Sequence, residues 1–472
     1  MIYKIPEEYY QRIHHSRPRF KNNQEEVLIF VATEINKLNT LEKKEFDIKL
    51  RNSIRLFPGN ADKTTKTIDN WRTEISSFFG FIQRTQDNKH FFPSTMAKKL
   101  ANEQDLIQFY KYFLYYFQYP GGHLKSQENK KLIEKGVKFK PAQCILKVLE
   151  HGEKKTDKRF FLTKAEVTHC IFNDLRVTRN QRNIDEIVKL ILDNRALNIK
   201  YDTSGDVIRY AGDMLDYMNI ADLVITHDQN KFYINSSEKE VIASFIKSDN
   251  YFNLYDKFYE KDTINTSDLT KLTPVWFDYI NNDLGEELFK TDLYKYLGIE
   301  EQSYNNLVEE TIKDFKKQLD NNETIRTKDI GDFGEGLILG HEKQRVKNGG
   351  RTDLLHKILK IPTQFAVGYD IQSVELDDMK RYIEVKTTIS SKKLQFYSFH
   401  LTPNEWSSAA TLKDRYFVYR LGISKLGTEL HVVQDPVGLY KSDKIEMIPR
   451  DGADIKFNKD VSIKEDLLIW SN

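Results

Sequence analysis

The sequence has little cysteine, little proline and no long apolar run. It contains 2 cysteines and 11 prolines in 472 residues. Cys144 and Cys170 form no CxxC pair and lie near no tract with zinc-ligand spacing, which argues against a disulfide framework and a structural zinc site. No apolar run approaches the roughly 18 residues that cross a bilayer, and the opening MIYKIPEEYYQRIHHSRPRF mixes acids and bases where a signal peptide needs an apolar core. These absences predict a cytoplasmic protein with no membrane partner.

An excess of charge of one sign is also missing. The chain has 72 basic against 70 acidic side chains, a formal net charge of +2. Any surface for nucleic acid must therefore come from local clusters of bases, not from global charge. Hydrophobic residues at 39% are enough to bury cores despite 30% charged residues, so the length predicts a folded protein of about three domains.

Composition and periodicity divide the chain into segments of different character. Residues 1–125 and 126–250 each combine helical patterns with short strands, as in a winged-helix-like DNA-recognition module. The second has a capping box at Thr163 and Glu166. Residues 251–325 are predicted to form a helical linker, and glycines then cluster in 326–472, where helix, strands, helix and strand follow one another. The expected fold is multidomain: mostly α at the N-terminus, with an α/β, mixed-sheet domain at the C-terminus.

The segment RYIEVKTT, residues 381–388, carries the chemistry of the C-terminal domain. Its period-two alternation predicts a strand with Glu384 and Lys386 on one face. Asp370 lies fourteen residues earlier in GYDI, a spacing that suits neighbouring strands joined by the turn ELDD. Because Mg²⁺ needs only one or two protein carboxylates, Asp370, Glu384 and the carbonyl of Val385 are the candidate metal ligands. Lys386 is placed to orient the attacking water, and Glu335 to add an outer carboxylate.

The acid-x-Lys spacing alone does not decide between a nuclease and a structural ion pair. The same spacing occurs elsewhere in the chain, for example at Glu42, Asp47, Glu153 and Asp314, each followed two positions later by lysine. The triple at 384–386 differs because it has a strand pattern, an upstream Gly-Tyr-Asp strand and a Gly-Glu helix start. A cross-strand ion pair on an exposed strand stays the alternative.

Five blocks within residues 329–421 resemble a family of PD-(D/E)xK, or restriction-endonuclease-like, nuclease domains. The blocks are DIGDFGEGLIL, PTQFAVGYDIQS, RYIEVKTT, FHLTPNEWSSA and DRYFVYRLG, and they span about a fifth of the chain. Such domains recur at the C-termini of restriction and helicase-associated proteins and are often known only as domains of unknown function. The resemblance implies an active site with acids Glu335, Asp370 and Glu384 and the lysine Lys386.

A second resemblance lies in the N-terminal half. TEISSFFGFIQRTQDNKHFFPSTMAKKLANEQDLIQFYKYFLYYFQYP is similar to a segment of AlwI-type restriction endonucleases and their nicking relatives that runs through Gly-Lys-x-Leu-Ala to Trp-Gln-Tyr-Pro. Here Ala97 and Lys98 replace the glycine before the lysine, so individual base contacts do not transfer. The resemblance implies that this half reads DNA sequence. AlwI-type enzymes lack the NEW block, which implies that the recognition half is joined here to a different catalytic domain.

Clustered bases are the candidate DNA contacts. RVTRNQRN suits groove reading best, because arginine and asparagine make base-edge contacts, whereas lysines mainly bind phosphates. For each cluster a solvated face is the structural alternative. The predicted DNA-binding residues are Arg17, Arg19, Lys98, Arg176, Arg179, Asn180, Arg182, Lys347 and Arg351.

These features predict a type II-like restriction endonuclease. It would recognise a short duplex sequence and hydrolyse phosphodiesters with Mg²⁺, for which Mn²⁺ can substitute, and its separate domains permit cutting away from the site. One active site per chain cuts one strand, so double-strand cleavage calls for a homodimer or partner subunit, and a companion DNA methyltransferase is expected. The alternatives are a modification-dependent endonuclease of methylated DNA, a DNA-binding protein with an inactive nuclease-like domain, and a structural interaction protein.

Overall fold

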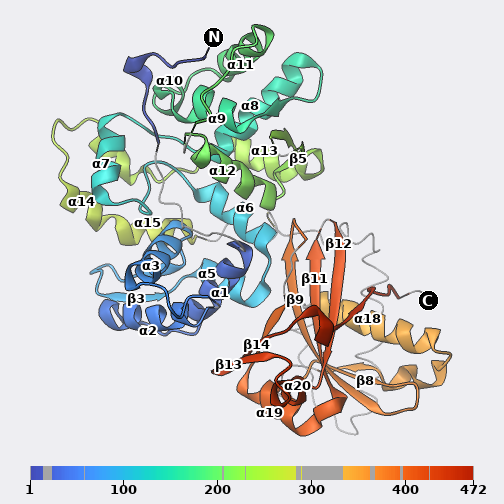
Figure 1. The fold of residues 1–472 in the computed structure, drawn as a ribbon. Helices are drawn as coiled ribbons and strands as arrows, with labels where there is room; N and C mark the ends of the chain where they lie inside the picture. The colour runs from blue at the N-terminus through green and yellow to red at the C-terminus, as the bar shows by residue number, and fades with distance from the viewer. Residues whose placement is uncertain are drawn as a thin grey trace, which may run out of the picture. The chain divides into compact units, whose positions relative to one another are not determined.

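The computed structural model divides the chain into two compact units, Met1–Thr291 and Asp292–Asn472. It describes residues 2–13, 24–57, 59–204, 207–228, 230–282, 289, 333–361, 367–393, 397–424 and 426–470. Figure 1 shows both units, the first mainly helical and the second built around a large sheet.

The N-terminal unit is built from short helices and two small sheets. The main helices are α1 (Gln24–Asn36), α2 (Lys43–Arg55), α5 (Thr95–Glu103), α6 (Leu106–Tyr116), α7 (Ser126–Glu134), α8 (Pro141–Thr156), α11 (Ile184–Ala196), α12 (Arg209–Ile220), α13 (Lys239–Lys247) and α15 (Thr273–Ile280). Shorter helices are α3 (Thr65–Asn70), α4 (Ser76–Phe78), α9 (Lys164–Val167), α10 (Leu175–Thr178) and α14 (Thr266–Lys271). The strands are β1 (Leu41–Glu42), β2 (Ile82–Arg84), β3 (His90–Pro93), β4 (Phe161–Leu162), β5 (Val224–Asp228) and β6 (Lys231–Ile234).

Both small sheets are antiparallel and have three strands. Their strand orders are β1-β3-β2 and β4-β6-β5. Strands β5 and β6 form an antiparallel hairpin, and the capping box of Thr163 and Glu166 opens α9 as predicted. Helix α6 contains the aromatic run FYKYFLYY, whose Phe109, Tyr110 and Phe113 are buried. That run forms core, as the sequence indicates, and is not a platform for stacked bases.

The C-terminal unit has a six-stranded mixed sheet of order β15-β12-β11-β9-β8-β7. Its strands are β7 (Leu359–Lys360), β8 (Ile371–Val374), β9 (Lys380–Ser390), β11 (Tyr416–Ser424), β12 (Gly427–Gln434) and β15 (Ile463–Glu465). Strands β9 and β11 pair in parallel, and the other neighbours pair antiparallel. Parallel neighbours need a crossover, and here it contains β10 (Ser398–Leu401) and α19 (Pro403–Leu412). The mixed sheet predicted from the sequence is therefore present.

Helices cover the six-stranded sheet, and a smaller sheet completes the C-terminal unit. Helix α18 (Phe333–Asn348) packs against β7, β8 and β9, whereas α19 packs against β11 and α20 (Pro436–Lys441). The second sheet has the order β10-β14-β13, with β13 (Glu446–Arg450) and β14 (Gly452–Lys456). A buried apolar cluster that includes Leu401, Val418 and Ile455 joins it to β11. The packing fixes α19 beside the strand that neighbours RYIEVKTT.

The expected segment boundaries are finer than this division. Segments 1–125 and 126–250 both fall within the first unit, and much of 251–325 lies outside the described residues. The boundaries at 125, 250 and 325 therefore stay predictions.

Candidate active site

Strand pairing brings Asp370 and Glu384 together. Strands β8 and β9 pair with Ile371 opposite Ile383, so one step further along the antiparallel register Asp370 faces Glu384. The backbone N–H of Asp370 donates to the carbonyl of Ile383 at 2.9 Å. The carboxylate of Asp370 is fixed as well, because its Oδ2 accepts a hydrogen bond from the N–H of Val385 at 2.8 Å. The two predicted metal-binding acids thus lie side by side, Asp370 just before β8 and Glu384 on the adjacent strand β9, as their spacing indicates.

Lys386 extends from β9 toward carboxylates on both sides of it. Its Nζ lies 2.6 Å from Oε1 of Glu384 and 2.9 Å from Oε2 of Glu405. Glu405 belongs to the first turn of α19, where it completes a capping box with Thr402. Glu405 is not part of the site that the sequence predicts. The sequence feature that could have indicated Glu405 is the NEW block, because its acid lies in the first turn of a helix that follows a strand.

Burial and like charge set the ionisation of the site. Glu384 is 4% exposed. Burial, together with the charges of Asp370 and Glu405, raises the pKa of Glu384 well above its usual value, although Lys386 acts in the opposite direction. Burial works to lower the pKa of Lys386, but the three carboxylates outweigh it and raise that pKa. Lys386 is therefore a cation at neutral pH and is suited to orient groups and offset negative charge, not to accept a proton.

Glu335 lies beside this cluster in a separate ion pair. It occupies the first turn of α18, and its Oε2 lies 2.7 Å from Nζ of Lys360 on β7. Lys360 pairs with Ile371, the residue after Asp370. A Cβ on the neighbouring Gly334 would lie 1.9 Å from Oγ1 of Thr387, so the helix start approaches β9 closely. The sequence did not predict the partner Lys360.

The donor set fits a hard divalent cation. When ionised, Asp370, Glu384 and Glu405 carry two more charges than Lys386 neutralises, and a divalent cation would balance that excess. Within the part of the chain that the structure describes, no group of three or more His, Cys, Asp or Glu side chains is arranged to hold a metal ion. Magnesium needs fewer protein ligands, because it keeps several waters. The chemistry of the site therefore suits Mg²⁺ better than Zn²⁺.

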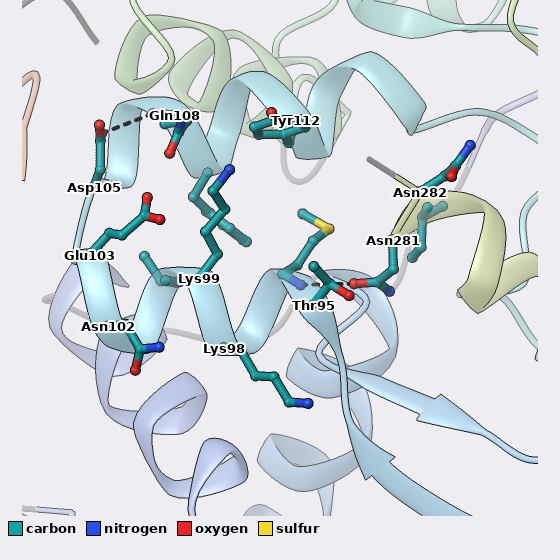
Figure 2. Close-up of a pocket in the computed structure, with 14 residues that line it drawn as sticks. Thr95, Lys98, Lys99, Asn102, Glu103, Asp105, Gln108, Tyr112, Asn281 and Asn282 are labelled. Carbon is teal, nitrogen blue, oxygen red and sulfur yellow. Dashed lines mark hydrogen bonds between the residues drawn. The ribbon is translucent and has the colours of Figure 1, made fainter. Parts of the chain in front are cut away.

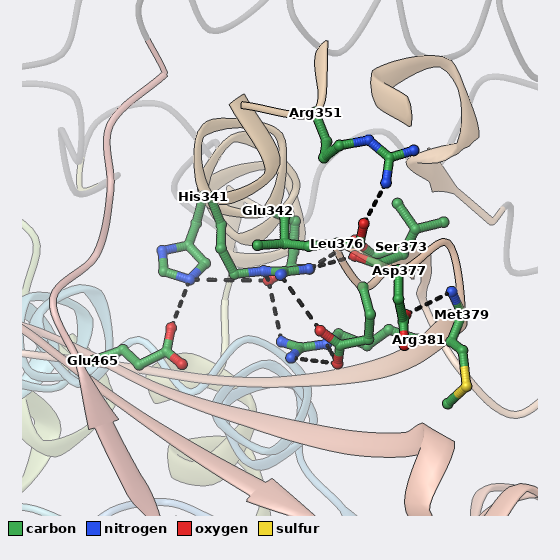
Figure 3. A network of polar contacts seen from close by, with 12 residues as sticks. His341, Glu342, Arg351, Ser373, Leu376, Asp377, Met379, Arg381 and Glu465 are labelled. Carbon is green, nitrogen blue, oxygen red and sulfur yellow. Dashed lines mark hydrogen bonds and ion pairs between the residues drawn. The ribbon is translucent and has the colours of Figure 1, made fainter. Parts of the chain in front are cut away.

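A second polar network lies between α18 and the sheet (Figure 3). Glu342, fully buried, pairs with Arg345 at 2.8 Å and accepts hydrogen bonds from Ser373 and Tyr419, both at 2.7 Å. Although burial acts to raise it, the pKa of Glu342 falls to about 2 because of Arg345, Arg381 and Ser373. Every strong acceptor is satisfied inside the fold, so this network is structural.

The predicted contacts Arg17 and Arg19 lie outside the described residues. Lys98 lines a pocket of about 250 Å³ between α5 and α6 (Figure 2). In the same pocket the ammonium of Lys99 lies 5.0 Å from the ring centroid of Tyr112.

The cluster RVTRNQRN is partly committed to the fold. Arg176 forms an ion pair with the fully buried Asp174, and Nη2 of Arg176 lies 2.6 Å from Oδ2 of Asp174. Arg182 lies 3.0 Å from Glu186. Arg179 contacts the side chain of Asn180 instead, where Nε donates to Oδ1 at 2.7 Å. Arg179 and the exposed Asn180 are therefore the members of the cluster best available for a ligand.

The C-terminal basic residues are also engaged. Lys347 lies over the ring of Trp470 at 4.9 Å. Arg351 pairs with Asp353 at 2.7 Å and donates to the carbonyl of Leu376.

Two known protein families match different segments of the chain. Residues 3–277, more than half of the chain, match the family described as "Restriction endonuclease BpuJI - N terminal". The chain belongs to this BpuJI family. Residues 334–432 match "Protein NO VEIN, C-terminal". The matched segment contains most of α18 together with the two acids and the lysine of the candidate site. The sequence predicted the recognition half of a restriction endonuclease, through a resemblance to the AlwI type. The family that matches this half is that of BpuJI.

A solved structure supports the fold of the BpuJI-like half. It is described as "Crystal structure of pyrene- and phenanthrene-modified DNA in complex with the BpuJ1 endonuclease binding domain". The similarity has a TM-score of 0.51 at 23% identity and covers 59% of this chain and 100% of that one. No curated protein matches the sequence. Among the described residues, no helix is long and apolar enough to cross a membrane.

Proposed function

We propose that this protein is a restriction endonuclease that recognises a short duplex DNA sequence and hydrolyses phosphodiesters with Mg²⁺. The observation that carries the proposal is the convergence of Asp370, just before β8, with Glu384 and Lys386 on β9. Membership of the BpuJI N-terminal family supports the recognition half, because the similar solved domain is described in complex with DNA.

In this proposal the N-terminal unit contains winged-helix-like recognition modules. Two three-stranded antiparallel sheets set among helices support that assignment. The C-terminal unit is proposed to be a PD-(D/E)xK domain, supported by an α18–β8–β9 arrangement that presents two acids and a lysine.

The residues divide the chemical work. Asp370 and Glu384, with the carbonyl of Val385, would hold Mg²⁺, and Glu335 would contribute from outside. Bound Mg²⁺ lowers the pKa of a coordinated water and stabilises charge on the phosphate. Lys386 orients the attacking water and offsets the developing negative charge, which its cationic state allows. The hydrogen bond from Val385 to Asp370 keeps this acid, just before β8, aligned with Glu384 on β9.

The partners follow from one active site per chain. Cutting both strands of duplex DNA requires a homodimer during cleavage or a second nuclease subunit, and a single chain acting alone would nick. A companion DNA methyltransferase would protect the host's own sites. Mn²⁺ would replace Mg²⁺ because both are hard cations that take oxygen ligands.

Digestion of plasmid DNA tests the proposal directly. Protein incubated with plasmid and Mg²⁺ is expected to give discrete fragments, and Lys386→Ala is expected to bind the same DNA without cutting it. A continuous smear would contradict sequence recognition, and unchanged cleavage by the variant would contradict the active site. Parallel digests of methylated and unmethylated plasmid separate a restriction enzyme from a modification-dependent one. Binding without cleavage under all metal conditions would indicate an inactive nuclease-like domain.

A further inference from the structure

Lys386 is held between two carboxylates that come from different elements. Glu384 is two positions away on the same strand, whereas Glu405 comes from α19, beyond β10. The acid-acid-lysine set from β8 and β9 does not include Glu405. Its position therefore calls for a separate account.

The start of α19 fixes the carboxylate of Glu405. Oε2 of Glu405 accepts a hydrogen bond from the N–H of Thr402 at 3.0 Å, and the N–H of Glu405 donates to Oγ1 of Thr402 at 3.4 Å. The same Oε2 accepts from Nζ of Lys386 at 2.9 Å. Because α19 packs against β11 and β14, this oxygen belongs to a rigid part of the unit. The side chain of Glu405 is 16% exposed, so water competes little for the contact.

A second holder for the lysine has a use in the proposed reaction. Glu384 is the acid best placed to bind a metal ion, and an oxygen that binds a cation is a weaker partner for an ammonium. A lysine held by Glu384 alone would lose much of its restraint when the metal arrives. Glu405 would retain it, since its anchor is the backbone N–H of Thr402 and does not involve the metal-binding acids.

We propose that Glu405 is a positioning residue that holds the Lys386 ammonium in place for catalysis and leaves Glu384 free to bind the metal ion. The inference rests on the proposed function for its catalytic part. Its structural part, that Glu405 restrains Lys386, holds independently of any cleavage.

Two variants separate positioning from helix capping. Glu405→Gln keeps an oxygen that can accept from the N–H of Thr402 but removes the charge that holds Lys386. Thr402→Ala removes the capping hydroxyl but keeps the backbone N–H at position 402 that donates to Oε2 of Glu405. The capping change is expected to cost about 1 kcal/mol of stability, which a thermal melt of the full chain measures.

The first readout is the accessibility of the lysine in metal-free protein. Reductive methylation followed by peptide mass spectrometry should label Lys386 several-fold faster in Glu405→Gln than in the wild type or in Thr402→Ala. Equal labelling of the three proteins would overturn the inference, whether or not any of them cuts DNA. If Lys386 is labelled faster in Glu405→Gln than in the wild type but the wild type cuts no DNA, the result would refute the proposed function and the catalytic part of the inference. The structural part would stand.

The second readout is single-turnover cleavage of the recognised DNA. Glu405→Gln should lower the rate by about 10- to 100-fold with unchanged DNA affinity, whereas Thr402→Ala should stay within about twofold of wild type. In a Lys386→Ala background, Glu405→Gln should cause no further loss, because the residue acts through the lysine. An equal rate loss in Thr402→Ala, or an additive loss in the double variant, would overturn the inference.

Discussion

Oδ2 of Asp370 accepts a hydrogen bond from the backbone N–H of Val385 at 2.8 Å. This contact ties the acid just before β8 to the one residue that lies between Glu384 and Lys386 on β9. The side chains of those two residues point to the same face of the strand, because they are two positions apart. This main-chain donor therefore fixes the carboxylate of Asp370 relative to Glu384 and Lys386.

Replacing Glu384 with Gln should abolish cleavage and stabilise the metal-free fold at neutral and alkaline pH. The folded pKa of Glu384 lies above its unfolded value, mainly through burial, so its contribution to stability is present below the unfolded pKa and is lost as pH rises through the folded pKa. Glutamine avoids that loss. The gain in melting temperature over wild type should shrink as pH falls toward about 4.5. Thermal melts of both proteins across this range check the sign, and a gain that grows on acidification would contradict it.

Mg²⁺ should raise the melting temperature of the wild type more than that of Glu384→Gln. A ligand that binds the folded state stabilises it in proportion to the logarithm of its concentration above Kd. The variant loses one carboxylate of the proposed site and should show a smaller rise. Calcium in place of magnesium serves as a non-catalytic comparison, and equal shifts in both proteins would argue that the ion binds elsewhere.

Replacing Glu342 with Gln should destabilise the C-terminal unit by about 3–5 kcal/mol, because it leaves Arg345 and Arg381 buried beside a neutral group. Ser373→Ala, which removes one hydrogen bond to the same carboxylate, is the matched control and should cost about 1 kcal/mol. Since the folded pKa of Glu342 is about 2, its stabilisation is present above its unfolded pKa and is lost as pH falls toward about 2. Urea unfolding at several pH values measures both effects.

Replacing Arg176 and Arg179 one at a time should separate an effect on stability from an effect on DNA binding. Arg176→Ala leaves the fully buried Asp174 without its closest partner and should cost about 3 kcal/mol in urea unfolding. Arg179→Ala removes a hydrogen bond to Asn180 and the packing of the Arg179 stem over Gly136, but breaks no ion pair with a buried acid, and should change stability by less than about 0.5 kcal/mol. If Arg179 contacts a phosphate, its loss should weaken DNA binding and reduce the salt slope by about 1. Full DNA affinity in Arg179→Ala would remove this residue from the interface.

The sequence determined the parts of the site that depend on local periodicity. Alternation in RYIEVKTT predicted the strand β9 and the shared face of Glu384 and Lys386, and both are present. The spacing to Asp370 predicted adjacent strands, which the β8–β9 register confirms. These features are local because strand geometry repeats every two residues and a short turn joins antiparallel neighbours.

Only the tertiary structure decided which distant groups complete the cluster. Glu405 reaches Lys386 because a crossover through β10 and α19 returns the chain beside β9, and no periodicity in the sequence encodes that return. The ion pair of Glu335 with Lys360 likewise depends on how α18 packs on β7. The same holds for RVTRNQRN, where folding commits Arg176 to a buried aspartate that the sequence presents only as a nearby charge. Side-chain partners of this kind are set by packing between elements, since charge is visible in a sequence but burial and direction are not.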